Sequence, residues 1–180
     1  DFEDMEKNKL FLIDAMAMIY RAFYAMNKSP RINSKGLDTS AAFGFFNTLL
    51  SLLKQYKPTH IGIAFDLHGP TFRHKEFADY KSNRQATPDE IRQMEPYIRK
   101  IIAAMHIPMI SSEGYEADDV IGTLSKQAAK QGFEVFMVTP DKDYAQLVEE
   151  NIKILKLGRM GSEDLWFAWS RSFPHTSVTA

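Results

Sequence analysis

The 180-residue sequence contains no cysteine, which excludes a disulfide framework and a thiolate metal site. It also lacks any apolar run approaching the ~18–20 residues that a membrane-spanning helix needs. Neither a glycine-rich phosphate loop nor a serine-nucleophile motif is present. The formal net charge is only -1, so no overall basic excess points to nucleic acid. These absences leave a globular protein whose composition fits a reducing cytoplasm.

What the sequence does contain is enough apolar material for one domain, arranged as short strands that alternate with helices. Hydrophobic residues make up 44% of the chain, which is enough for a sizeable core. This alternation predicts an α/β fold with a mostly parallel central sheet and helices on both faces. The expected strands are 10–13, 60–65, 107–110, 134–138 and 152–155, and the expected helices are 39–54, 114–131 and one that opens at 87.

The helix that opens at Thr87 has a strong start signal. Thr87 suits the N-cap, Pro88 the first position, and Glu90 follows three residues after the cap. No periodicity is clear in the last residues, which hold both tryptophans, so no element is predicted there. The apolar residues expected to face the core from this helix are Ile91, Met94, Ile98, Ile101 and Ile102.

Aspartates stand at the carboxyl ends of three expected strands. Asp14 and Asp66 each follow a buried strand, and the pair Asp141 and Asp143 follows another. A lone aspartate there is usually a helix cap or a turn former. Several carboxylates at one sheet edge would raise one another's pKa, and this edge is where ligands bind in such folds. A hard cation such as Mg²⁺ or Mn²⁺ removes that cost because it takes oxygen ligands.

The segment GYEADDVIG adds three carboxylates within four positions, at the start of the expected helix 114–131. Glu116 and Asp119 lie three residues apart and share a helix face, while Asp118 points to another side, within reach of a neighbouring ion. Asp141 and Asp143 flank one residue, so in extended backbone both side chains point the same way. A site this broad can hold two ions about 3.5–4 Å apart, the spacing of two-metal phosphoryl chemistry.

The segment GPTFRHKEFADYKSNRQATP interleaves aromatic and basic residues. Such a pattern is typical of a solvated amphipathic helix. It also suits a strip that follows a nucleic-acid backbone, with cations on phosphates and an aromatic ring under a base. The segment by itself leaves both interpretations open. Its aromatic and basic residues are Phe72, Arg73, Lys75, Phe77, Tyr80, Lys81 and Arg84.

Four motifs together resemble the 5′-nuclease domain family of bacterial DNA polymerase I: LFLIDAMAMIYRAFYA, FDLHGPTFRHKEFADYKSNR, GYEADDVIGTL and VTPDKDYAQLV, in this order. The family is similar to flap endonucleases and, more distantly, to PIN-type nucleases. The resemblance implies a hydrolase that uses two Mg²⁺ or Mn²⁺ ions as a 5′-3′ exonuclease or flap endonuclease near DNA 5′ ends. It further implies primer removal, replication and repair at the nucleoid in the cytoplasm, no membrane, and fusion to or cooperation with a polymerase domain.

The same resemblance assigns roles by position. It makes Lys81 the catalytic lysine, with Asp119 and Arg84 also catalytic, and it places a helical arch around residues 70–100. The expected first metal cluster is Asp14, Asp66, Glu116, Asp118 and Asp119, with Asp141 and Asp143 as part of the second. The expected DNA contacts are Arg21, Arg73, Tyr80, Lys81 and Arg84.

The resemblance covers about Lys9 to Leu155 and fades beyond Leu157. Family members continue with two more aspartates for the second metal and a helix-hairpin-helix that grips the duplex. We therefore predict a nuclease domain over 1–157 and an atypical tail over 158–180, either truncated or non-native. The alternative function is an impaired fragment that binds metal and single-stranded DNA without turnover.

Overall fold

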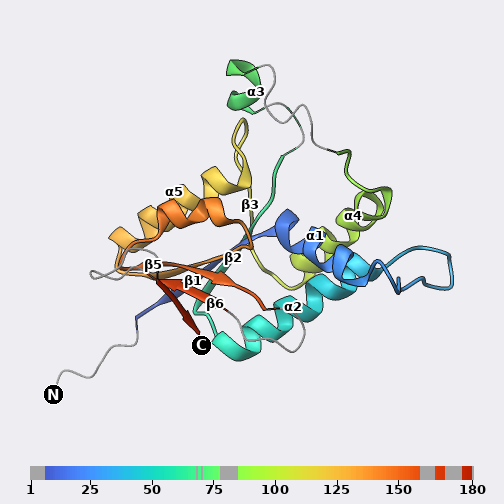
Figure 1. Cartoon of the computed structure of the whole chain (residues 1–180), viewed down its shortest axis with the longest axis horizontal. Helices are drawn as coiled ribbons and strands as arrows, with labels where there is room; N and C mark the ends of the chain where they lie inside the picture. Colours follow the sequence, from blue (N-terminus) through green and yellow to red (C-terminus); the bar gives the residue numbers. More distant parts are fainter. Residues whose placement is uncertain are drawn as a thin grey trace.

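The computed structural model describes residues 7–67, 69, 71–77, 85–158, 165–168 and 176–179. One seven-stranded sheet has the strand order β3-β2-β1-β4-β5-β6-β7 (Figure 1). Neighbouring strands from β3 to β5 pair in parallel, whereas β6 pairs antiparallel with both β5 and β7. The strands are β1 (Lys9–Asp14), β2 (His60–Ala64), β3 (Met109–Ile110), β4 (Glu134–Val138), β5 (Ile152–Lys156), β6 (Leu165–Ala168) and β7 (Thr176–Thr179).

Helices cover both faces of the sheet, with α5 on one side and α1, α2 and α4 on the other (Figure 1). The predicted α/β fold with a mostly parallel sheet is therefore confirmed. The helices are α1 (Ala15–Met26), α2 (Ser40–Tyr56), α3 (Phe72–Glu76), α4 (Asp89–Ala104), α5 (Ala117–Lys130) and the 3₁₀ helix η1 (Lys142–Leu147). None of the helices in the described ranges is long and apolar enough to cross a membrane.

The central strand β1 contributes to two cores, because successive side chains point to opposite faces of a sheet. Phe11 and Ile13 lie in the larger core beneath α1, α2 and α4. Leu12 lies in the smaller core beneath α5. All three side chains are fully buried, as expected for a strand in the middle of a parallel sheet. This burial explains why the strand reads as a continuous apolar run, and it fixes where Asp14 leaves the sheet.

Helix α4 begins later than its start signal predicts. Its N-cap is Pro88, without a side-chain capping bond, and its first residue is Asp89. The hydroxyl of Thr87, predicted as the cap, instead accepts a hydrogen bond from the hydroxyl of Tyr20 at 2.9 Å. The core-facing prediction is wrong at Ile101, which is 42% exposed. The other four predicted positions are buried.

The ends of α2 and α5 follow from local chemistry. Lys57 closes α2 in a left-handed conformation (φ 45°) immediately before Pro58. Gly132 stands two residues beyond α5 with φ 89°, a region that glycine enters without strain. The predicted end of the helix near Gln131 is thus confirmed. Strand β3 is shorter than predicted, and β6 and β7 were not predicted at all.

Candidate metal centre at the carboxyl edge of the sheet

The acidic cluster is built into the first turn of α5. Glu116 is the N-cap residue, with extended backbone, and forms a reciprocal capping box with Asp119. The backbone N–H of Glu116 donates to Asp119 Oδ2 at 3.1 Å, and the N–H of Asp119 donates to Asp118 Oδ1 at 2.7 Å. One carboxylate oxygen from each of the three lies within 4.8 Å of the others. Asp118, which the spacing placed on another side, therefore lies with the other two.

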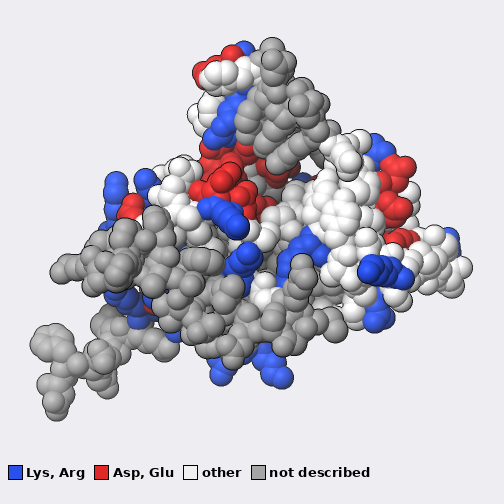
Figure 2. Space-filling model, in the orientation of Figure 1, with Lys and Arg blue, Asp and Glu red and all other residues white. Residues whose placement is uncertain are grey.

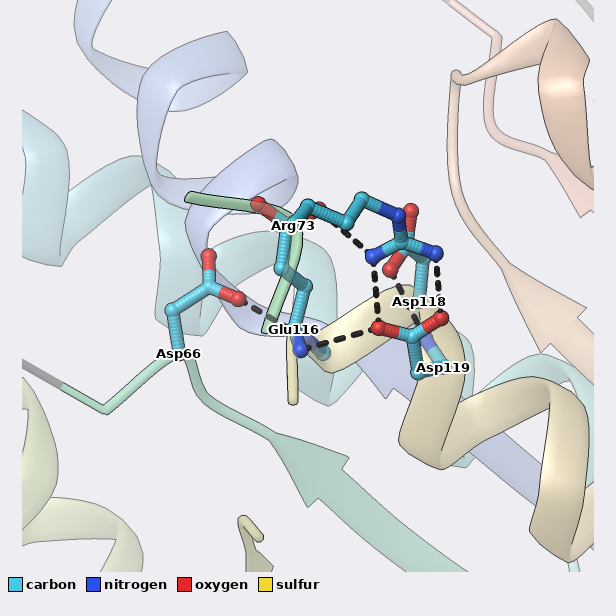
Figure 3. Close-up of polar contacts among 6 residues, drawn as sticks. Asp66, Arg73, Glu116, Asp118 and Asp119 are labelled. Atoms are coloured by element: carbon cyan, nitrogen blue, oxygen red, sulfur yellow. Dashed lines mark hydrogen bonds and ion pairs between the residues drawn. The ribbon is translucent and has the colours of Figure 1, made fainter. Parts of the chain in front are cut away.

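Arg73 supplies a positive charge to this cluster (Figure 3). Its guanidinium donates to both oxygens of Asp119, at 2.7 Å from Nη1 and 2.6 Å from Nη2. A third bond of 3.3 Å joins Nη1 to Glu116 Oε2. Arg73 comes from α3, which the backbone N–H of Phe72 also ties to Gly114 O at 2.9 Å. The predicted phosphate contact thus lies on two of the predicted metal ligands.

Asp14 and Asp66 reach the same edge from β1 and from the loop after β2. Asp66 Oδ1 accepts from the N–H of Ala117 at 2.7 Å, within the first turn of α5 (Figure 3). Asp14 Oδ1 caps α1 by accepting from the N–H of Ala17 at 3.1 Å. Each aspartate therefore caps a helix, which was the alternative to metal binding, and still keeps lone pairs for a second partner.

Electrostatics shows that these carboxylates are close enough to affect one another. Burial raises the pKa of Asp14 from 3.8 to about 6; the charges of Asp66 and Asp118 also raise it, while hydrogen bonds from Ala17 and Tyr144 lower it. Burial also raises the pKa of Asp118, and the charges of Asp119 and Glu116 add to that rise. A cation at this edge would relieve both costs.

Asp141 and Asp143 lie at the start of η1. Asp141 caps the helix by accepting from the N–H of Asp143 at 2.9 Å. Asp143 is inside the 3₁₀ turn, so the prediction that both side chains project from extended backbone is wrong. The local Asp141 bond stabilises this turn in place of an extended strand. Both side chains are exposed.

A cleft of about 270 Å³ lies between α5 and η1. Figure 2 shows acidic side chains gathered on this part of the surface, with basic side chains next to them. The cleft residues that were not predicted include Lys126, which lies two helical turns beyond Asp119, and Tyr144, which directly follows Asp143. Helical spacing and sequence adjacency were the available signals. The charged and hydroxyl-bearing residues around the cleft are Arg73, Asp118, Asp119, Thr123, Lys126, Asp143 and Tyr144.

Of the predicted DNA contacts, Arg73 lines the acidic cleft, whereas Arg21 lies elsewhere. Arg21 donates to the carbonyls of Leu157, at 3.3 Å, and Gly158, and so holds the chain that leaves β5. Arg21 is not among the described residues that line the acidic cleft. Tyr80, Lys81 and Arg84 lie outside the described residues.

Comparison with known proteins identifies the family of this chain. The sequence profile described as "5'-3' exonuclease, N-terminal resolvase-like domain" matches residues 9–170. DNA polymerase I of Bacillus subtilis is 43% identical over 163 residues, which cover 90% of this chain. DNA polymerase I of Geobacillus stearothermophilus is 41% identical over 88% of the chain. The chain spans 18% of the length of each of these relatives.

Solved structures agree on the fold. T5 5′-exonuclease with bound divalent metal ions (zinc) superposes with a TM-score of 0.62 at 20% identity, covering 81% of this chain and 54% of that one. T5 D15 protein co-crystallised with metal ions gives a TM-score of 0.59, covering 81% and 53%. At this identity the likeness concerns the fold alone. The profile match and the polymerase I relatives show that the chain belongs to the family of 5′-3′ exonuclease N-terminal resolvase-like domains.

Proposed function

We propose that this chain is a divalent-metal-dependent 5′-3′ exonuclease and flap endonuclease that hydrolyses phosphodiester bonds in DNA near 5′ ends. The observation that carries the proposal is the cluster of Glu116, Asp118 and Asp119 at the carboxyl edge of the parallel sheet, in a chain of this family. The relatives named DNA polymerase I support a place beside or fused to a polymerase domain. In the proposal, the chain acts in primer removal, replication and repair at the nucleoid. The nuclease domain of the proposal is residues 1–157, followed by the atypical tail 158–180, whose strands β6 and β7 extend the same sheet.

The donor set fits Mg²⁺ or Mn²⁺. All three cluster side chains are carboxylates, and hard cations of this size take oxygen ligands. Burial raises the pKa of Asp14 and of Asp118, and neighbouring carboxylates add to the rise, so a cation here would stabilise their ionised forms. In the proposal, the first ion is held by Asp14, Asp66, Glu116, Asp118 and Asp119, and a second partly by Asp141 and Asp143.

Bound ions of this kind supply an activated water and stabilise the leaving oxygen. The chain's own residues bind and orient the substrate. Lys126 offers a cation in the same cleft, two helical turns along α5 from Asp119, where it can contact a neighbouring phosphate. Arg73 can do the same once its guanidinium leaves Asp119. Lys81 and Arg84 act on the scissile phosphate in the proposal, Tyr80 stacks near the 5′ strand, and Arg21 contacts DNA.

The test is single-turnover cleavage of a 5′-labelled flap DNA in Mg²⁺, Mn²⁺ or EDTA. Asp119→Asn removes one carboxylate of the cluster with little change in shape, so cleavage should fall by at least about 100-fold. Glu134→Gln is the matched control, because Glu134 is also ion-paired, with Lys153, but at the amino end of β4. It should cleave like the wild type. Cleavage in EDTA, or full activity of Asp119→Asn, would contradict the proposal.

A further inference from the structure

Tyr144 is a buried polar side chain beside the acidic cluster. Only 2% of its surface is exposed. Its hydroxyl donates to Asp14 Oδ2 across 3.3 Å, from η1 to the end of β1. These two residues are 130 positions apart in the chain, so the bond is a product of the fold.

Packing accounts for the ring of Tyr144 but not for its hydroxyl. The ring belongs to the smaller core, with Leu12, Ile121 and Met137. A phenylalanine would fill the same space. A buried hydroxyl costs free energy unless it is hydrogen-bonded, and the partner here is the carboxylate of a proposed metal ligand.

The hydroxyl remains a proton donor at any physiological pH. Burial raises the pKa of Tyr144 above its ordinary value, and the negative charges of Asp14, Asp118 and Asp141 raise it further. Asp14 is thereby held at both oxygens, with Oδ1 bonded to the N–H of Ala17 and Oδ2 to Tyr144. Two such bonds fix the plane of a carboxylate, and each oxygen keeps a lone pair for a cation.

We propose that Tyr144 is a positioning residue for the metal centre, whose hydroxyl orients Asp14 toward the divalent ion. Residues that hydrogen-bond to a metal ligand set the orientation of that ligand, and losing one typically weakens metal binding about 10–100-fold. The same bond ties η1, which carries Asp141 and Asp143, to the strand that carries Asp14. Tyr144 therefore fixes the position of Asp141 and Asp143 relative to Asp14. This inference rests on the proposed function, because it requires that Asp14 binds metal.

The first experiment measures Mn²⁺ and Mg²⁺ binding by calorimetry for the wild type, Tyr144→Phe and Tyr20→Phe. Tyr20 is the matched control, since its hydroxyl is also part-buried and donates to a side chain, Thr87, at 2.9 Å. Tyr144→Phe should raise the dissociation constant by about tenfold or more, and Tyr20→Phe should leave it unchanged. Equal affinities for all three proteins would overturn the inference and leave the proposed nuclease intact. If the wild type bound no divalent ion, the proposed function would fail and the inference with it.

Two further measurements separate positioning from general damage to the fold. In cleavage assays, Tyr144→Phe should need more metal for half-maximal rate, while its rate at saturating metal stays within about threefold of the wild type. A loss of rate that added metal does not restore would contradict positioning. A double-mutant cycle with Asp14→Asn, measured as unfolding free energy in EDTA, tests the bond itself without any metal. Additive effects in that cycle would show that the hydroxyl does not act through Asp14.

Discussion

Replacing Arg73 with glutamine tests whether its guanidinium and a divalent ion share the same carboxylates. The side chain makes bonds of 2.6 and 2.7 Å to Asp119 and 3.3 Å to Glu116. Arg73 is 27% exposed at its side chain, Asp119 22% and Glu116 9%, so the ion pair is neither a surface pair nor a fully buried one. The cost of breaking it should fall between the two limits, at about 2–3 kcal/mol in EDTA. For a chain of this size that corresponds to a fall in melting temperature of about 4–12 °C.

The same substitution should act in the opposite direction on metal affinity. A positive charge beside Asp119 repels a divalent ion, so Arg73→Gln should bind Mn²⁺ at least about tenfold more tightly. By linkage, the ion weakens the Arg73 pair by the same factor that Arg73 weakens ion binding. The melting-temperature difference between variant and wild type should therefore shrink in saturating Mn²⁺.

The assay is thermal unfolding followed by circular dichroism, in EDTA and in Mn²⁺, combined with calorimetric titration. Arg92→Gln is the matched control, because Arg92 pairs with Asp89 on the exposed side of α4 and should not respond to metal. An equal loss of stability in EDTA and Mn²⁺, together with unchanged metal affinity, would refute the reasoning. In that case Arg73 would be only a structural ion pair.

Two more variants test other parts of the structure. Asp14→Asn should make stability less dependent on pH: the pKa of Asp14 is raised to about 6, so its contribution is complete below about pH 4 and is lost as pH rises to about 6. In urea unfolding without divalent ions, the variant should gain up to about 3 kcal/mol on the wild type between pH 4 and 8, and parallel pH curves would count against this. Gly44→Ala should destabilise the chain by about 1–2 kcal/mol despite better helix propensity, because its Cβ would lie 2.8 Å from that of Ala22. Ser51→Ala, exposed on the same helix, is its control, and a stabilised Gly44→Ala would disprove the close α1–α2 packing.

Short apolar runs in the sequence predicted most of the central sheet, because strands buried on both faces consist of consecutive apolar residues. Four of the five predicted strands match closely, and α2 and α5 end where Pro58 and Gly132 indicate. Strands β6 and β7 lack such a signal. Each is only four residues long and pairs antiparallel at the β5 side of the sheet. Strand pairing of this kind depends on the neighbour that a segment meets, which its own residues do not specify.

The candidate site also has one part that the sequence predicted and one part that it did not. The carboxylates could be predicted because parallel strands end at a common edge, a rule of topology that does not depend on side-chain contacts. The partners of those carboxylates could not be predicted. Arg73 reaches Asp119 across 46 residues and Tyr144 reaches Asp14 across 130, and local spacing holds no information at such separations. At the start of α4, a long-range contact made a local prediction wrong. The hydroxyl of Thr87 is hydrogen-bonded to Tyr20 of α1 and does not cap α4.

The helix-capping bonds of Asp14, Asp66 and Asp119 have a consequence for the thermodynamics of metal uptake. Backbone N–H groups already restrain these three side chains. An incoming ion would therefore freeze few side-chain torsions, and displacement of the Arg73 guanidinium would return conformational entropy to that side chain. The entropy of metal binding should then differ little between the wild type and a variant destabilised far from the site, such as Gly44→Ala. The coordination geometry would be a property of the helix termini, set when the polypeptide folds.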